Sequence, residues 1–138
     1  MSCFTLLEYK DNNETSTLIA SDAQNILSKI DFYFSGTNNV FFPRQNTSCQ
    51  GSLCVLTVEN ISPPIQRTIS YSDNSLFIAE GGGGQRKISG LPVSAFSVDH
   101  FVNAYKTSVV SISFTLQATS SLGISMSQDF HTNYYVRK

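Results

Sequence analysis

The first regular pattern along the chain is helical. Between residues 19 and 34 apolar residues recur at intervals of three and four, which places them on one face of a helix. Polar residues such as Asp22, Asn25 and Lys29 fall on the other face. The apolar stripe consists of Ile19, Ala23, Ile26, Leu27, Ile30 and Phe34.

Both ends of this helix carry expected signals. The hydroxyl of Ser16 or Thr17 can cap the first turn, and Gly36 can adopt the left-handed conformation that ends many helices. We therefore expect a helix over residues 16–35. Residues 1–15 are polar for the most part, and we interpret them as a frayed leader or a cloning remnant.

Beyond residue 36 the pattern changes to that of β-strands. In residues 108–118 apolar side chains alternate with Ser, Thr and Gln, which predicts a strand with one buried and one solvated face. Ser72-Asp73-Asn74-Ser75 is a strong turn signal between two such segments. The other predicted strands are residues 53–59, 67–71, 76–79, 86–89, 93–102 and 130–137.

These elements predict one domain over residues 1–138 with an α+β fold. One N-terminal amphipathic helix would pack on an antiparallel β-sheet domain formed by residues 39–138. No further helices are predicted that could connect parallel strands. We expect surface loops at Thr37–Gly51, Glu80–Gln85 and Thr119–Gln128.

Composition favours a protein that works outside the cytoplasm. Charged residues make up only 14% of the chain, below the usual quarter, and Ser, Thr and Asn supply most polar positions. The net charge of −1 and the scattered Lys and Arg argue against nucleic acid as a partner. No apolar run is long enough to span a membrane, and no secretory leader is present. We therefore expect an N-terminal segment to have been removed.

Cys49 and Cys54 are the cysteines with informative spacing. Gln-Gly-Ser between them is turn-like, so the pair can close a short disulfide loop. Two free thiols, or half of a metal site, remain alternatives. A zinc site would need further ligands, and only Cys3, His100 and His131 are left, all isolated in the sequence. We expect a disulfide and no metal.

Three features invite a catalytic or metal-binding interpretation, and each has a simpler one. Gly81–Gly84 precedes a strand-like segment rather than the helix that a phosphate loop requires, so we interpret it as a hairpin tip. His100 and His131 lie in strands, without a nucleophile elbow elsewhere, and we expect both to be surface or half-buried strand histidines. Asp73–Ser75 lacks the Gly and the distal Glu of a calcium loop. We expect no enzyme activity, no catalytic residue and no cofactor.

Most of the ten Phe and six Tyr are expected in the core, with a ligand groove of exposed aromatics as the alternative. The N-x-S/T sequons at Asn13, Asn46 and Asn60 would matter only in a eukaryotic source.

Two stretches resemble a known family. Phe4-Thr5-Leu6-Leu7-Glu8 resembles the start of mature type IV pilins and type II secretion pseudopilins. Residues 88–98, 109–116 and 129–138 resemble minor pilin-like proteins, whose last strand often ends near an Arg. The order of helix, β-domain and terminal strand is similar too, so the resemblance covers most of the chain.

The resemblance implies roles for the N-terminal residues. Phe4 would be the first mature residue, and Glu8 would be the glutamate that neutralises the free amine of a neighbouring subunit. The family continues with a long apolar half-helix that anchors the subunit in the inner membrane before assembly. Here Tyr9-Lys10-Asp11 follows instead, and these residues do not enter hydrocarbon. We interpret the chain as lacking that apolar half-helix.

The function that follows is structural. The resemblance implies a minor pilin or pseudopilin of a bacterial envelope filament for secretion, adhesion or DNA uptake. Its partners would be other pilin or pseudopilin subunits, its location periplasmic or extracellular, and its membrane contact limited to the missing segment. The alternative is a free-standing extracellular or virion-associated β-module that binds glycan or protein.

Overall fold

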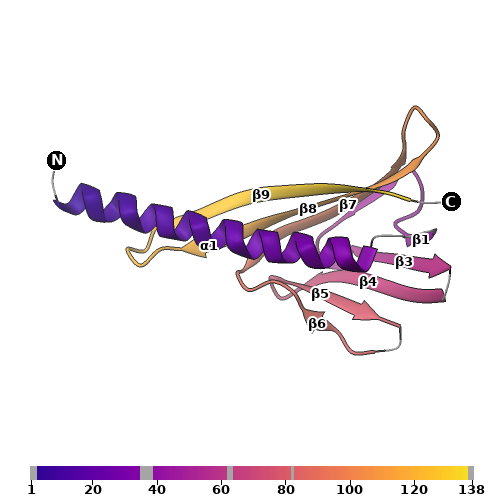
Figure 1. Cartoon of the computed structure of the whole chain (residues 1–138), viewed down its shortest axis with the longest axis horizontal. Coiled ribbons are helices and arrows are strands. Elements are labelled where there is room, and N and C mark those ends of the chain that lie inside the picture. Colours follow the sequence, from indigo (N-terminus) through magenta and orange to yellow (C-terminus); the bar gives the residue numbers. More distant parts are fainter. Residues whose placement is uncertain (1–2, 35–38, 62–63, 82, 137–138) are drawn as a thin grey trace.

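The computed structural model describes residues 3–34, 39–61, 64–81 and 83–136, with only the backbone described for 3–12, 33, 60, 61 and 64. Helix α1 (Cys3–Phe34) runs along the molecule, with two antiparallel sheets beside it (Figure 1). Sheet A has the strand order β1 (Asn39–Phe42), β3 (Val55–Ile61), β4 (Pro64–Ser72), β5 (Ser75–Glu80), β6 (Arg86–Lys87). Sheet B has the order β2 (Thr47–Gln50), β7 (Val93–Val102), β8 (Ser108–Thr119), β9 (Ser125–Tyr135).

This architecture corrects the expected fold class. We expected an α+β, pilin-like domain with the helix packed on an antiparallel β-sheet domain, and that expectation is wrong. The described chain is mainly β-structure, its strands are divided between two sheets, and its α-helix lies at the N-terminal end. Alternation shows which face of a strand is buried but does not identify the neighbouring strand. The division into two sheets was therefore not visible in the sequence pattern.

Helix α1 begins much earlier than expected. It starts at Cys3, so residues 3–15 are not a frayed leader. No Gly or Pro precedes Gly36, and the ordinary residues there each cost less than about 0.7 kcal/mol in a helix. Thr17 is no cap, because its hydroxyl donates a hydrogen bond to the Asn13 carbonyl (2.9 Å) inside the helix. Gly36, the expected stop, lies outside the described residues.

The apolar stripe of α1 forms one side of the core. Every predicted member is buried except Leu27, which is partly buried and packs against the same cluster. Thr15, one turn earlier, is also buried. The stripe belongs to one core cluster with residues of both sheets, among them Leu56 and Ile69 of sheet A and Ile112 and Phe114 of sheet B. Full burial of each Ile or Phe side chain contributes about 1.5–3 kcal/mol to the free energy of unfolding.

The two predicted hairpins with the clearest signals form, although one is longer than expected. Asp73 and Asn74 have φ angles of 49° and 57° and make the two-residue turn between β4 and β5. Strand β9 pairs with β8 as expected, but it starts at Ser125 rather than near residue 130. Residues 120–124 alone make the connecting turn, in which Gly123 adopts a φ of 82°.

Strands β1 and β2 were missed. Both lie in residues 37–51, which we expected to be a surface loop. Each has only four residues and pairs with one neighbour, β1 with β3 and β2 with β7. Short edge strands of this kind have too few positions to show a period of two.

The segment Ile88–Pro92 joins the two sheets to each other and to the helix. The Ile88 N–H donates to the Leu76 carbonyl of β5 (2.9 Å), and the Gln117 N–H of β8 donates to the Pro92 carbonyl (2.9 Å). Between these points, Gly90 N–H donates to both carboxylate oxygens of Asp22 (2.9 and 3.2 Å), and Leu91 N–H donates to Oδ2 (3.0 Å). One helix carboxylate therefore satisfies two backbone amides of the crossing segment.

We predict that Asp22→Ala destabilises the fold without changing the helix. Hydrogen bonds to a charged acceptor contribute about 1.5–3 kcal/mol, and the variant leaves two amides unpaired. Urea unfolding followed by circular dichroism measures this loss. Asn25→Ala, at an exposed position of the same helix, is the matched control and should change the unfolding free energy by less than about 0.5 kcal/mol. Equal effects of the two variants would contradict the proposed contact.

From the partly buried phenol of Tyr134 we predict that the folded state loses stability at alkaline pH. Burial raises the pKa of its phenol above the ordinary 10.0, the Asp31 carboxylate raises it further, and a hydrogen bond with Thr132 lowers it. Because the folded pKa is raised, the folded state holds this proton more tightly than the unfolded state. The resulting stability is present below pH 10.0 and is lost as the pH rises through the folded pKa.

Unfolding free energies measured from pH 8 upward, in steps of about half a unit, test this effect. Above the ordinary tyrosine pKa, the free energy of unfolding should fall less steeply with pH in Tyr134→Phe than in the unmodified chain. Tyr135→Phe, at the exposed neighbouring position, is the control for loss of a hydroxyl. An identical pH dependence in the Tyr134 variant and the unmodified chain would rule the explanation out.

Candidate assembly and binding surfaces

The first half of α1 projects beyond the β-domain. Figure 1 shows its N-terminal end extending past both sheets. The helix has 32 residues, a length of about 48 Å. Among the helix residues whose side chains are described, which start at Asn13, the buried stripe begins at Thr15. An isolated helix of about twelve residues is marginal in water. The projecting half is therefore the part of the fold that a packing partner would stabilise most.

Phe4 and Glu8, the residues to which the resemblance gives assembly roles, belong to this projecting half. Their backbone is helical, and their side chains lie outside the described residues. From Cys3 to Thr15 the sequence holds three carboxylates, Glu8, Asp11 and Glu14, against one cation, Lys10. Phe4, Leu6 and Leu7 precede them. The projecting half thus combines apolar residues with negative charge.

The outer face of sheet B is polar and carries little charge. A shallow hollow of about 400 Å³ on sheet B is lined by residues that include Ser97, Ser113, Asp129 and His131. Its polar groups pair separately: Thr115 donates to Asp129 (2.6 Å), and His131 Nδ1 lies 3.5 Å from Ser111 Oγ. A catalytic triad needs nucleophile, base and carboxylate in one chain of hydrogen bonds, and these pairs do not form one.

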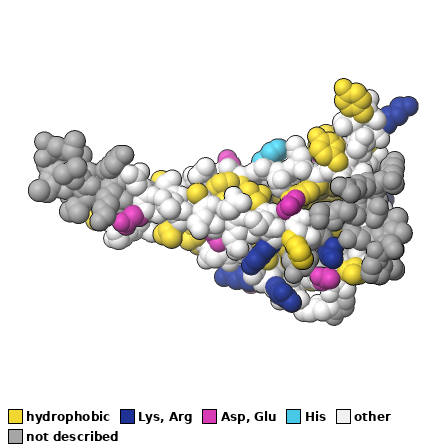
Figure 2. Space-filling view, viewed as in Figure 1, with side chains coloured by type: hydrophobic (Ala, Val, Ile, Leu, Met, Phe, Trp, Pro, Cys, Tyr) yellow, Lys and Arg dark blue, Asp and Glu magenta, His cyan; other side chains and the backbone are white. Residues whose placement is uncertain are grey.

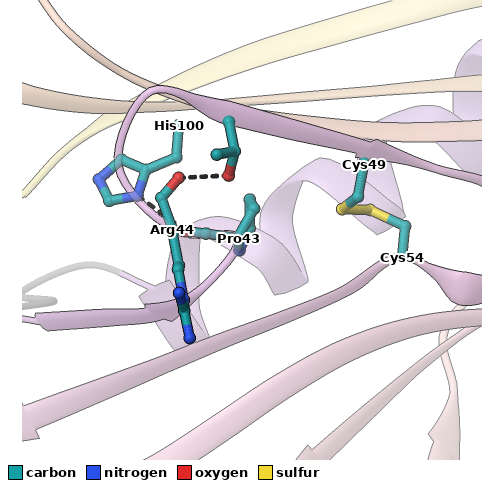
Figure 3. The surroundings of a disulfide bond; sticks show 6 residues. Pro43, Arg44, Cys49, Cys54 and His100 are labelled. Carbon is teal, nitrogen blue, oxygen red and sulfur yellow. Dashed lines mark hydrogen bonds between the residues drawn. A yellow bond between two sulfur atoms is a disulfide. The ribbon is translucent and has the colours of Figure 1, made fainter.

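Cys49 and Cys54 form a disulfide, with 5.0 Å between their Cα atoms (Figure 3). Cys49 belongs to β2 of sheet B, and Cys54 lies directly before β3 of sheet A. The short 3-10 helix Gly51–Leu53 separates them. The disulfide predicted from the spacing of these two cysteines is therefore present, and it links sheet A to sheet B covalently. Cys3 lies in the first turn of α1, and its side chain is outside the described residues.

His100 is a buried residue with a structural contact. Only 6% of it is exposed, and its Nδ1 donates to the carbonyl of Pro43, at 2.9 Å. Pro43 follows a cis peptide bond between β1 and β2, so the contact ties this connection to the end of β7. Figure 3 shows the Arg44 side chain directed away from the His100 ring. His100 Nε2 has no hydrogen-bond partner among the described residues. We expected a surface or half-buried strand histidine, whereas the structure shows a buried one.

Exposed aromatic side chains gather at the end opposite the N-terminus. Figure 1 places β1, the hairpin between β7 and β8, and the last residues of β9 at this end. The aromatic residues exposed there are Phe41, Phe42, Phe101, Tyr105 and Tyr135, with Tyr105 89% exposed. Asn103 Oδ1 accepts hydrogen bonds from the Tyr105 and Thr107 amides and orders the hairpin tip. Tyrosine on an ordered turn is common at protein interfaces.

The remaining predicted features take structural roles. Gly81–Gly84 connects β5 to β6, with Gly82 outside the described residues, so a strand and not a helix follows the glycines. Asn13 and Asn46 are exposed, and the Asn60 side chain is outside the described residues. Among the described residues no group of three or more His, Cys, Asp or Glu could hold a metal ion.

The sequence pattern missed one cluster of charge. Lys29 of α1 and Arg86 and Lys87 of β6 line the same cleft, although they are far apart in the chain. The adjacent Arg-Lys pair was visible, but its distance from Lys29 depends on how α1 crosses sheet A.

Comparison with known proteins adds no identification. No protein-family model, curated protein or solved structure matches this chain. No helix in the described residues is long and apolar enough to cross a membrane.

Proposed function

We propose that this chain is a structural subunit of a bacterial envelope filament, of the minor pilin or pseudopilin kind. It would serve secretion, adhesion or DNA uptake through assembly and display, without catalysis. One observation carries this proposal: α1 remains helical well beyond the β-domain that packs against its second half. The motif resemblance of Phe4–Glu8 and of the last strand supports the same assignment.

The projecting half-helix is suited to association because binding would cost it little conformational entropy. Its backbone is already helical, so a partner helix would gain contacts without first ordering a disordered segment. Packed helices bury apolar residues against one another, and each buried leucine contributes about 1.5–3 kcal/mol. The partners in this proposal are other pilin or pseudopilin subunits.

A periplasmic or extracellular location belongs to the same proposal. The disulfide between Cys49 and Cys54 supports it, because such bonds persist in oxidising compartments and are rare in the cytosol. Anchoring in the inner membrane before assembly rests only on the resemblance of Phe4–Glu8 to mature pilins.

The aromatic end of the β-domain favours a second candidate function. A free-standing extracellular or virion-associated module could bind glycan or protein through the surface that includes Phe101, Tyr105 and Tyr135. In that case the projecting half of α1 would have no part in the activity. The two functions therefore differ in which end of the molecule is essential.

We predict that Leu6→Asp with Leu7→Asp abolishes assembly while the β-domain stays folded. Burying two carboxylates in a helix interface is strongly unfavourable. Sedimentation velocity over rising protein concentration, and immunogold labelling of surface filaments in the source bacterium, report assembly. The thermal unfolding midpoint reports the fold, and it should stay within about 2 °C of the unmodified chain.

Leu18→Asp is the matched control, because Leu18 is 60% exposed where α1 already packs on the β-domain. It should leave assembly unchanged. Filaments that carry the Leu6 and Leu7 variant at normal levels would argue for the free-standing module instead.

The proposed location predicts the oxidation state of the cysteines in cells. Protein extracted under acid quenching and treated with a maleimide should be unlabelled at Cys49 and Cys54. After reduction, both should be labelled, as peptide mass spectrometry can show. Labelling of both residues before reduction would place the protein in a reducing compartment and contradict the proposed location.

A further inference from the structure

A cationic cleft lies between the second half of α1 and the edge of sheet A. It has a volume of about 230 Å³ and is open to solvent. Ser28, Lys29 and Phe32 line it from α1, and Ile78, Arg86 and Lys87 line it from β5 and β6. Figure 2 shows Lys and Arg side chains gathered on this face of the molecule.

The cleft combines positive charge with an apolar wall. Ile78 is buried at its base, whereas the ring of Phe32 is 75% exposed. Among the described residues, no ion pair involves Lys29, Arg86 or Lys87, and the nearby Glu80 pairs with Arg67 of the adjacent strand (3.6 Å). Three cations therefore stand together on a chain whose net charge is −1.

Protection of the sheet edge explains only part of this arrangement. Lysine and arginine on an edge strand such as β6 discourage the addition of another strand. That role accounts for Arg86 and Lys87, but it does not account for Lys29 or for an exposed phenylalanine on the facing helix. Ser28, Lys29 and Phe32 span one helical turn, so the cleft follows the side of α1. Its positive charge and apolar wall suit an acidic, partly apolar segment.

We propose that the cleft receives the projecting half of α1 from a second copy of this chain. This inference deepens the proposed function and rests on it. The projecting half has the complementary composition, with Glu8, Asp11 and Glu14 beside Phe4, Leu6 and Leu7. Figure 1 shows that its N-terminal end extends past both sheets. The cleft of the same chain is lined by residues from the second half of α1 and from sheet A and its edge.

The contact would be head-to-tail. The cleft and the projecting half-helix are different surfaces of the same chain. In each contact, one copy therefore contributes its cleft and the next copy contributes its projecting half-helix. Contacts of this kind repeat from copy to copy, and they close into a ring or continue as a filament according to the rotation between copies. Charge complementarity would fix which face of the incoming helix enters.

Photo-cross-linking tests the occupant directly. The change Phe32→p-benzoylphenylalanine puts a cross-linking ring at an exposed position of the cleft. Irradiated assemblies should yield peptides joined between residue 32 of one copy and residues 3–15 of another. Cross-links to any other part of a second copy, or none in assemblies that form normally, would overturn the proposal.

Charge exchange is the second measurement. Arg86→Glu with Lys87→Glu, and Glu8→Lys with Asp11→Lys, should each weaken association about tenfold or more when tested alone. A mixture of the two variants should recover most of the lost affinity, because the reversed helix then meets the reversed cleft. The control carries Arg44→Glu and Lys106→Glu, which reverse two exposed cations outside the cleft. It should associate normally.

The outcomes separate the two proposals. Unchanged association of the Arg86 and Lys87 variant would overturn the cleft contact while leaving assembly through α1 intact. No association of the unmodified chain, in solution or in filaments, would overturn both.

Discussion

The carboxylate of Asp22 holds α1 against the segment that passes from sheet A to sheet B. Gly90 and Leu91 donate their amides to it, and the residues on either side of them pair with β5 and β8. A connection between two sheets has backbone groups that neither ladder can satisfy. One helix side chain supplies the missing acceptors, so the position of the helix and the joining of the sheets depend on the same contact. The closest fit is at Gly90, where a Cβ would come within 3.0 Å of Asp22 Oδ1.

This anchoring divides α1 into two parts with different tasks. From Thr15 to Phe34 the helix completes a core shared by both sheets, and the burial of its stripe supplies the driving force. Its N-terminal end continues past the sheets as helix, and a helical segment that lacks tertiary packing is marginal in water. The same rigid element thus connects the folded domain to a surface suited to association. The disulfide and the contact of His100 with Pro43 brace the opposite end, where the exposed aromatic residues lie.

Charge is sparse on this chain, and its distribution is therefore informative. Carboxylates outnumber cations in the projecting half of α1, whereas Lys29, Arg86 and Lys87 meet in one cleft. With few other charges nearby to screen or compete, these two regions would attract each other over roughly 8–10 Å at physiological salt. Polar contacts elsewhere come mainly from hydroxyls, as between Tyr71 and the Val93 carbonyl or between Ser89 and the Leu76 amide. Such contacts support the fold without adding charge.

The sequence alone determined the local features whose signals are complete within a short window. The apolar stripe from Ile19 to Phe34 and the Asp73-Asn74 turn follow from residue spacing, and both are present. The alternation predicted for β8 is present from Ile112 onward, whereas residues 108–112 are buried on both faces. The predicted start of α1 was wrong because the hydroxyls of Ser16 and Thr17 resemble a helix cap. The helix begins at Cys3 instead, since no Gly or Pro before Ser16 interrupts it. Strands β1 and β2, the division into two sheets and the cationic cleft were decided by tertiary structure. Each depends on which distant segments become neighbours, as when β2 pairs with β7 or Lys29 comes beside Lys87, and the order of residues does not record that choice.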